Sequence, residues 1–172
     1  NCNAYSSPDQ KIIDNLKNVV SLKFKFQQKI DNNNIEKGEC IILYPKKIFC
    51  KYYDIYNKIL VSNGKSLVIN SDKITNHYRY PLDKTPLNLI LDKDFLIEKI
   101  KKSESRIIDN KYINFTILKN NNEINIFFDK KNLNLIGWQT EDIYQNLVIT
   151  YIYRIKLNQM INKNIFKLPK MN

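Results

Sequence analysis

The feature that most limits the possible folds is a repeated alternation of strand-like runs and turn-forming residues over most of the 172 residues. Apolar and polar side chains alternate with a period of two from Leu22 to Gln27, which is typical of a half-buried strand. Turn signals rich in Asn, Asp, Gly or Lys then lie at 31–34, 44–47, 54–57, 63–65 and 70–73. Asn63-Gly64 is the strongest of them, because a type I′ hairpin needs positive φ at both positions. The pattern predicts an antiparallel meander.

The second half of the chain continues the pattern. Further strand-like runs lie at 105–109, 112–118, 123–129, 133–140 and 147–157. The last run is long for one strand, and it places one set of alternating apolar residues on one face: Leu147, Ile149, Tyr151, Tyr153, Ile155 and Leu157. A long strand that curves through a large sheet or an open barrel fits this pattern.

Two segments depart from the strand pattern and predict helices. Apolar residues recur at helical spacing over about residues 9 to 20, with Ser7 or Asp9 as a candidate cap for the first turn. From Thr85 to Lys102, the pair Thr85-Pro86 combines a capping residue with a first-turn proline, and one or two short helices are expected. The fold class is therefore α+β, in one domain that covers residues 1–172.

Composition narrows the classes of partner. The formal charge is +11 and the pI is about 9.4, so acidic partners are expected: anionic lipid, an acidic protein face or nucleic acid. An AT-rich genome would also enrich Lys, Asn and Ile, which halves the weight of this charge as a functional signal. No apolar run reaches the length of a membrane span, and the polar start suits a mature N-terminus.

The residues that commonly carry metal or catalytic chemistry are few. Cys2, Cys40 and Cys50 have no Cys-x-x-Cys spacing, and the single histidine, His77, does not complete a zinc site with them. No nucleophile motif accompanies His77, which is expected to be a surface strand residue. The sequence predicts a protein without enzymatic activity, metal or cofactor.

Several short motifs occur in a recognisable order. They are Phe24-Lys25-Phe26-Gln27-Gln28, Gly38, Tyr44-Pro45, the hairpin Val61 to Leu67, Thr85-Pro86-Leu87, Ile126 to Asp129, Trp138 to Asp142, and Asn162 with Phe166 to Pro169. Each is common alone, but their order over residues 9 to 169 resembles the LolA family of periplasmic lipoprotein carriers.

The resemblance implies an incomplete antiparallel β-barrel, a half-barrel, whose concave apolar face is covered by the N-terminal helix and by mid-chain lid helices. It further implies a periplasmic monomer that takes acylated lipoproteins from an inner-membrane ABC transporter and delivers them to an outer-membrane receptor. A cavity would shield the acyl chains in transit, because each exposed CH₂ costs about 0.8 kcal/mol in water. No nucleic-acid partner is implied.

The strand pattern and the resemblance together nominate site residues. The expected acyl-binding residues of the concave face are Phe24, Phe26, Ile42, Ile59, Val61, Ile126, Phe128, Trp138, Ile149, Tyr151 and Tyr153. The expected lid residues are Leu87, Ile90, Leu91, Phe95 and Ile97. Each of these side chains is also compatible with an ordinary sheet core. The resemblance makes Tyr44 the lid-control position, because family members often carry there an arginine that ties the lid shut. A tyrosine hydroxyl can donate one hydrogen bond but forms no charge-assisted pair.

Three alternatives remain open at this level. Cys40 and Cys50 flank the Pro45 turn almost symmetrically, so they form either a disulfide or two buried thiols. If Cys2 were the acylated first residue of a mature lipoprotein, the outer-membrane receptor of the same fold, LolB, or another lipid-binding protein would be the better interpretation. Lysines interleaved with aromatic residues also suit a basic nucleic-acid-binding module.

Overall fold

Eleven strands form the framework of the described structure. The computed structural model describes residues 7–31, 33–73, 78–119, 121–141 and 145–170. The strands of the first half are β1 (Ser21–Ile30), β2 (Asn34–Leu43), β3 (Lys47–Tyr52), β4 (Ile59–Asn63), β5 (Ser66–Asn70) and β6 (Tyr78–Pro81). Those of the second half are β7 (Arg106–Ile108), β8 (Tyr112–Lys119), β9 (Asn122–Asp129), β10 (Leu135–Glu141) and β11 (Leu147–Leu157).

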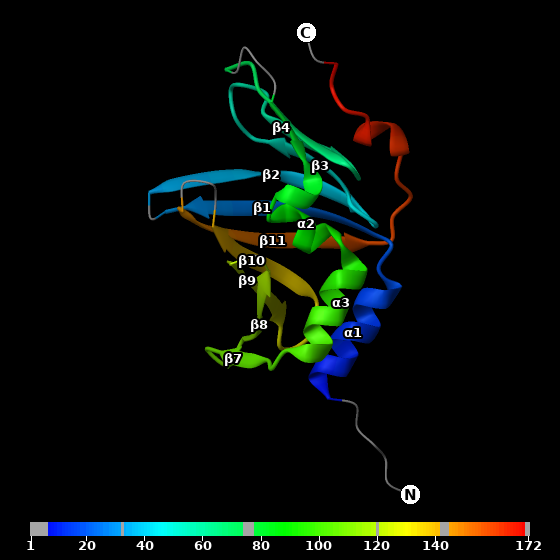
Figure 1. The fold of residues 1–172 in the computed structure, drawn as a ribbon, viewed down its shortest axis with the longest axis vertical. Helices are drawn as coiled ribbons and strands as arrows, with labels where there is room; N and C mark the ends of the chain where they lie inside the picture. Colours follow the sequence, from blue (N-terminus) through cyan, green and yellow to red (C-terminus); the bar gives the residue numbers. More distant parts are fainter. Residues whose placement is uncertain (1–6, 32, 74–77, 120, 142–144, 171–172) are drawn as a thin grey trace, which may run out of the picture.

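All of these strands belong to one antiparallel sheet. Their order is β6-β5-β4-β3-β2-β1-β11-β10-β9-β8-β7, so that β1 pairs with the last strand and the two halves of the chain form the two wings. The edge strands β6 and β7 do not pair with each other, and the sheet is strongly curved but open (Figure 1). The predicted α+β half-barrel is confirmed.

Three α-helices and two 3₁₀ turns complete the described part of the chain. They are α1 (Pro8–Asn18), η1 (Leu82–Lys84), α2 (Leu87–Leu91), α3 (Lys93–Lys102) and η2 (Lys163–Phe166). Ser7, one of the two predicted caps, caps α1, because its hydroxyl accepts a hydrogen bond from the Gln10 amide at 3.3 Å. Asp92 caps α3 through the Phe95 amide at 3.2 Å.

Two local predictions were wrong. Thr85 does not cap α2; its hydroxyl donates to the Leu82 carbonyl at 2.8 Å and so closes the preceding 3₁₀ turn. The hairpin between β4 and β5 is not type I′, since only Gly64 has a positive φ, +102°. The Asn63 carboxamide instead accepts from the amides of Lys65 and Ser66, both at 3.0 Å, and this side chain stabilises the turn.

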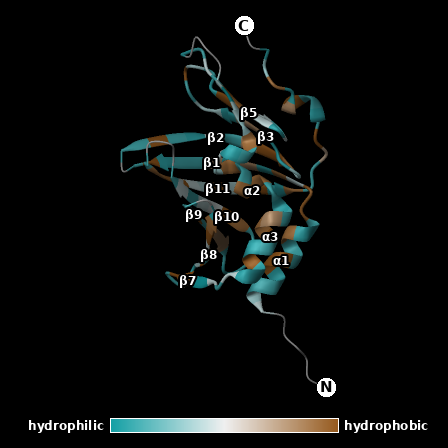
Figure 2. Ribbon diagram, viewed as in Figure 1, coloured by the Kyte–Doolittle hydropathy of each residue, from teal (hydrophilic) through white to brown (hydrophobic). Residues whose placement is uncertain are grey.

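The helices pack on the concave side of the sheet. Buried residues of α1, α2 and α3 join one hydrophobic core with alternate residues of the central strands, among them Leu22 and Phe24. Figure 2 shows hydrophobic and hydrophilic residues side by side along α1 and α3, as expected for helices with one buried face. The main core therefore lies between the curved sheet and the helices.

A second, smaller cluster lies on the convex side. Val61 and Val68 face each other across β4 and β5, both are buried, and neither belongs to the main core. Phe166 of η2 is also buried outside the main core, and η2 contacts β3 and β4. The C-terminal segment thus covers the convex side of this wing.

Candidate functional site

The concave face can be traced strand by strand from the register. Residues directly opposite each other in paired strands share a face. Phe24 is opposite Cys40, Cys40 is opposite Cys50, and Phe26 is opposite Ile152, and all of them are buried. Six of the nominated residues lie on this face and are buried: Phe24, Phe26, Ile42, Ile126, Phe128 and Trp138.

Two nominated residues of β4 lie on the other face. Val61 is opposite Phe49, and Ile59 is opposite Lys51, on the convex side. The alternation along β4 is hidden because Ile59, Leu60 and Val61 are all apolar, and Val61 is buried on the convex side in the cluster with Val68. Leu60, between them, is the residue that lies on the concave face, opposite Cys50.

The nominated face of β11 was also wrong. Ile149, Tyr151 and Tyr153 are opposite Lys29, Gln27 and Lys25, which are convex residues of β1. Tyr151 and Tyr153 are accordingly 49% and 42% exposed. A bulge at Arg154, with φ of +50°, shifts the alternation, so that Leu157 is opposite Leu22 on the concave side. The alternating apolar residues of β11 (Leu147–Leu157), which the sequence pattern assigned to one face, therefore lie on both faces of the sheet.

The nominated lid residues lie in α2 and α3. Ile90 and Leu91 are fully buried and Ile97 is nearly so, all within the core that includes Phe24. Leu87 and Phe95 are partly buried against the same core. The residues of α1 that complete the cover, Ile12, Ile13 and Leu16, were missed as lid residues although their helical spacing was recognised.

Small pockets lie between the helices and the concave face of the described structure. One, of about 60 Å³, is bounded by Leu87 of α2 and by wall residues that include Phe24, Leu60 and Trp138; we call it the lid pocket. Another, of about 190 Å³, lies beside α1 between Leu16 and Phe128. Ligand pockets commonly measure roughly 300–1,000 Å³. The helices thus fill most of the space that an acyl chain would need.

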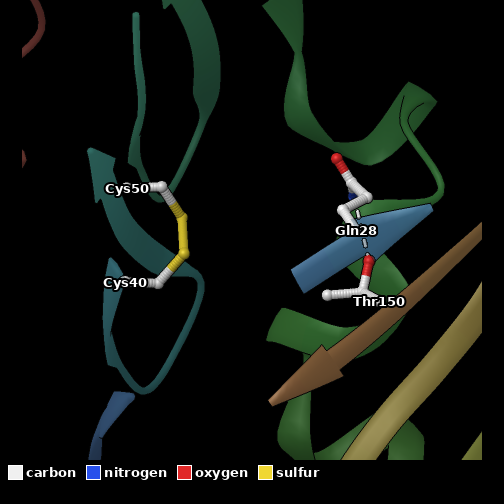
Figure 3. Close-up of a disulfide and its surroundings, with 4 residues drawn as sticks. All are labelled: Gln28, Cys40, Cys50 and Thr150. Atoms are coloured by element: carbon white, nitrogen blue, oxygen red, sulfur yellow. Dashed lines mark hydrogen bonds between the residues drawn. A yellow bond between two sulfur atoms is a disulfide. The ribbon is translucent and has the colours of Figure 1, made fainter. Parts of the chain in front are cut away.

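The wall of the lid pocket is stabilised by aromatic and covalent contacts. The rings of Phe24 and Trp138 meet edge to face at 6.4 Å, and those of Phe26 and Tyr52 at 5.1 Å. Cys40 and Cys50 form a disulfide across β2 and β3, with their Cα atoms 4.1 Å apart (Figure 3). The structure therefore contains the first of the two states that the sequence left open for these cysteines.

One polar pair interrupts the apolar wall. The Gln28 side-chain amide donates a hydrogen bond to the Thr150 hydroxyl at 2.9 Å, between β1 and β11 (Figure 3). Both residues line the lid pocket. Nearby on the concave side, Lys58 forms an ion pair with Glu36 at 3.1 Å and lies over the Tyr52 ring. This part of the concave face therefore suits ligand groups with hydrogen-bond donors and acceptors.

Tyr44 does not hold the lid by a hydrogen bond. Its hydroxyl has no partner among the described residues, and burial raises the pKa of this hydroxyl well above its usual range, so it stays neutral. The turn that carries it holds the lid in other ways. The Lys46 amide donates to the Leu91 carbonyl at 3.0 Å, and the Lys46 ammonium lies 3.7 Å from the Asp92 carboxylate.

Lys93, at the start of α3, completes this set of contacts. Its ammonium donates to the Val19 carbonyl at 2.7 Å, at the C-terminal end of α1, and lies over the Tyr44 ring at 5.4 Å. We call Lys46, Asp92 and Lys93 the lid anchor. Sequence reasoning missed it, because the contacts join segments about 45 to 75 residues apart and no local pattern marks them.

Other chemistry is limited to what the described residues show. No group of three His, Cys, Asp or Glu side chains among them is arranged to hold a metal ion. None of their helices has the length and apolar character needed to cross a membrane. Cys2 and His77 lie outside the described residues.

Comparisons with known proteins agree with this geometry. The family model described as outer membrane lipoprotein carrier protein LolA matches residues 17–169. No curated protein matches the chain in sequence. An uncharacterized conserved protein from Thermus thermophilus has a TM-score of 0.56 at 7% identity, over 95% of this chain and 96% of its own. A putative outer membrane lipoprotein-sorting protein domain from Vibrio parahaemolyticus has a TM-score of 0.50 at 8% sequence identity, over 93% of this chain and 97% of its own.

Proposed function

Since the chain belongs to the LolA family of outer membrane lipoprotein carrier proteins, we propose that it carries acylated lipoproteins across the periplasm with their acyl chains shielded on its concave face. In this proposal the whole chain acts as one monomeric carrier domain. It is loaded by an inner-membrane lipoprotein-releasing ABC transporter and unloaded at an outer-membrane receptor, and it catalyses no reaction.

The observation that carries the proposal is the buried apolar interface between the sheet and the helices. Wall and lid residues are buried from water in one core. They are Phe24, Trp138 and Ile126 on the wall and Ile90 and Leu91 on the lid. An acyl chain gains about 0.8 kcal/mol per CH₂ on leaving water, but here it must first displace the helices. The lid thus competes with the ligand, and this competition keeps binding reversible.

The polar pair fits the boundary between an acyl chain and its headgroup. Gln28 and Thr150 supply a carboxamide oxygen and a hydroxyl beside an otherwise apolar wall, where an ester or peptide group of the lipoprotein can bind. In this arrangement the acyl chains lie along Phe24 and Trp138.

Binding of a fluorescent acyl probe tests the function directly. We expect triacylated lipoprotein to displace the probe and single-stranded oligonucleotide to leave it bound. Displacement by oligonucleotide, or no probe binding at all, contradicts the carrier function and favours the nucleic-acid alternative. A second assay, with membranes that contain the lipoprotein-releasing transporter and ATP, should yield a water-soluble complex of lipoprotein with this chain.

The lid anchor gives the first prediction. Lys93→Met keeps the aliphatic part of the side chain but removes the donor that joins α3 to the Val19 carbonyl. The lid should then open more readily, and acyl-probe affinity should rise several-fold, up to about tenfold, as measured by titration.

Lys102→Met is the matched control for this prediction. Lys102 also lies in α3 and is also ion-paired, with Glu98 at 3.0 Å, but both side chains are exposed and the pair lies within α3 itself. We expect it to bind the probe like the wild type. A Lys93→Met protein with unchanged or weaker probe binding would show that these contacts do not hold the lid closed.

A further inference from the structure

A set of basic and aromatic side chains occupies the convex side of the central strands, opposite to the lid. The register places Lys51 opposite Glu39, Glu39 opposite Lys25, and Lys25 opposite Tyr153. Two residues further along the strands, on the same face, Lys37 is opposite Gln27, and Gln27 is opposite Tyr151. We call this surface the Lys–Tyr face and define it by Lys25, Lys29, Lys37, Lys51, Tyr151 and Tyr153.

The positive charge of this face is only partly compensated within the described structure. Glu39 is the single carboxylate on the convex side of the described parts of β1, β2, β3 and β11, and it accepts a hydrogen bond from the Tyr53 hydroxyl at 3.0 Å. No lysine of the face forms an ion pair with a described residue. Lysines often protect the edges of sheets, but these strands are central and paired on both sides.

The tyrosines add an amphipathic component. Tyr151 and Tyr153 are about half exposed on the strand that pairs with β1. Tyrosine rings favour the boundary between water and lipid headgroups, and lysines near an anionic bilayer are attracted to it. We propose that the Lys–Tyr face docks the protein on the anionic headgroups of a bilayer surface, an inference that rests on the proposed carrier function.

Lipid suits this face better than nucleic acid does. Single-stranded nucleic acid is commonly held in a basic groove that follows its backbone, whereas this part of the sheet bulges outward. A broad layer of headgroups needs no groove.

Docking through this face has a consequence for transport. The lid helices pack on the concave side, and the C-terminal segment packs beside Lys47 and Asn63, at the opposite end of β3 from Lys51. Neither therefore covers the Lys–Tyr face. The carrier can therefore remain at a membrane surface while its lid and cavity stay free to engage cargo. Membrane docking and acyl binding should be separable by mutation.

Vesicle sedimentation at low salt tests the proposal. The test variant is Lys29→Gln/Lys37→Gln/Lys51→Gln, and its matched control is Lys101→Gln/Lys111→Gln/Lys131→Gln, which removes the same charge from exposed lysines elsewhere. With vesicles of phosphatidylcholine and about one third phosphatidylglycerol, the test variant should bind roughly 100-fold more weakly than the wild type. The control should bind within about threefold of the wild type, and pure phosphatidylcholine should bind none of them strongly.

Acyl-probe titration of the same variants separates this proposal from the carrier function. We expect both triple variants to keep the wild-type probe affinity. A wild type that binds anionic vesicles through these lysines but binds no acyl probe would overturn the carrier function and leave the docking surface standing.

Three results would overturn the docking surface itself. Equal weakening by the two triple variants would mean that only the net charge matters. Loss of vesicle binding with Ile55→Ser, at a residue 84% exposed in the loop after β3, and not with the test variant, would move the contact to that loop. Binding of oligonucleotide through the same lysines, with no binding to anionic vesicles, would assign the face to nucleic acid.

Discussion

Replacing Leu60 with glutamate is expected to abolish acyl-probe binding, whereas the same replacement at the neighbouring Ile59 should leave binding unchanged. Leu60 lies on the concave face, opposite Cys50 and Ile69, and it lines the lid pocket. Ile59 is opposite Lys51 on the convex face. An unpaired carboxylate inside an apolar cavity costs several kcal/mol, which corresponds to an affinity loss of at least about 100-fold.

The two variants control for each other. Both residues are partly exposed and lie next to each other in the same strand, so the backbone setting and the added charge are the same. Circular dichroism and thermal melting establish that each variant folds, and fluorescence titration gives the probe affinity. If Leu60→Glu bound the probe as well as Ile59→Glu did, the acyl chains would not lie on the concave face.

This pair also shows where sequence reasoning succeeds and where it stops. The predicted run at 147–157 matches β11 (Leu147–Leu157), and the run at 112–118 matches β8 closely, because turn residues mark strand ends locally. Which face of a strand meets the helices is harder to predict than where the strand ends. In Ile59-Leu60-Val61 both faces are apolar, so alternation carries no information about which side meets the lid.

The error in β11 has a distinct cause. The bulge at Arg154 inserts one residue, so the parity before it is opposite to the parity after it. The residue types near Arg154 do not predict the bulge. The polar partners of Tyr151 and Tyr153, which are Gln27 and Lys25, would have identified the convex face, but only once the pairing of β1 with β11 was known.

The lid anchor likewise forms only in the assembled fold, because its contacts join distant segments of the chain. The unusual residue at position 44 correctly drew attention to the turn between β2 and β3. Its hydroxyl nevertheless has no described partner, and the polar contacts to the lid come from Lys46 and Lys93. A resemblance carried over residue by residue could not have found them, because the donors occupy other positions of the sequence.

Truncation of the lid provides the second large effect, with opposite signs on stability and on binding. Ile90 is fully buried in α2, within the core shared with the wall. Ile90→Ala should lower the free energy of unfolding by about 2–4 kcal/mol, as measured by denaturant titration. Because the closed lid loses contacts that the ligand must otherwise displace, acyl-probe affinity should rise by about tenfold.

Val68→Ala is the matched control for this effect, since Val68 is equally buried but packs in the convex cluster, away from the lid. It should lower the free energy of unfolding by about 1–3 kcal/mol and leave probe affinity unchanged. The comparison thereby separates general destabilisation from lid opening. If Ile90→Ala weakened probe binding while Val68→Ala did not, Ile90 would be a contact for the bound acyl chain, and the helices would enclose the ligand rather than compete with it.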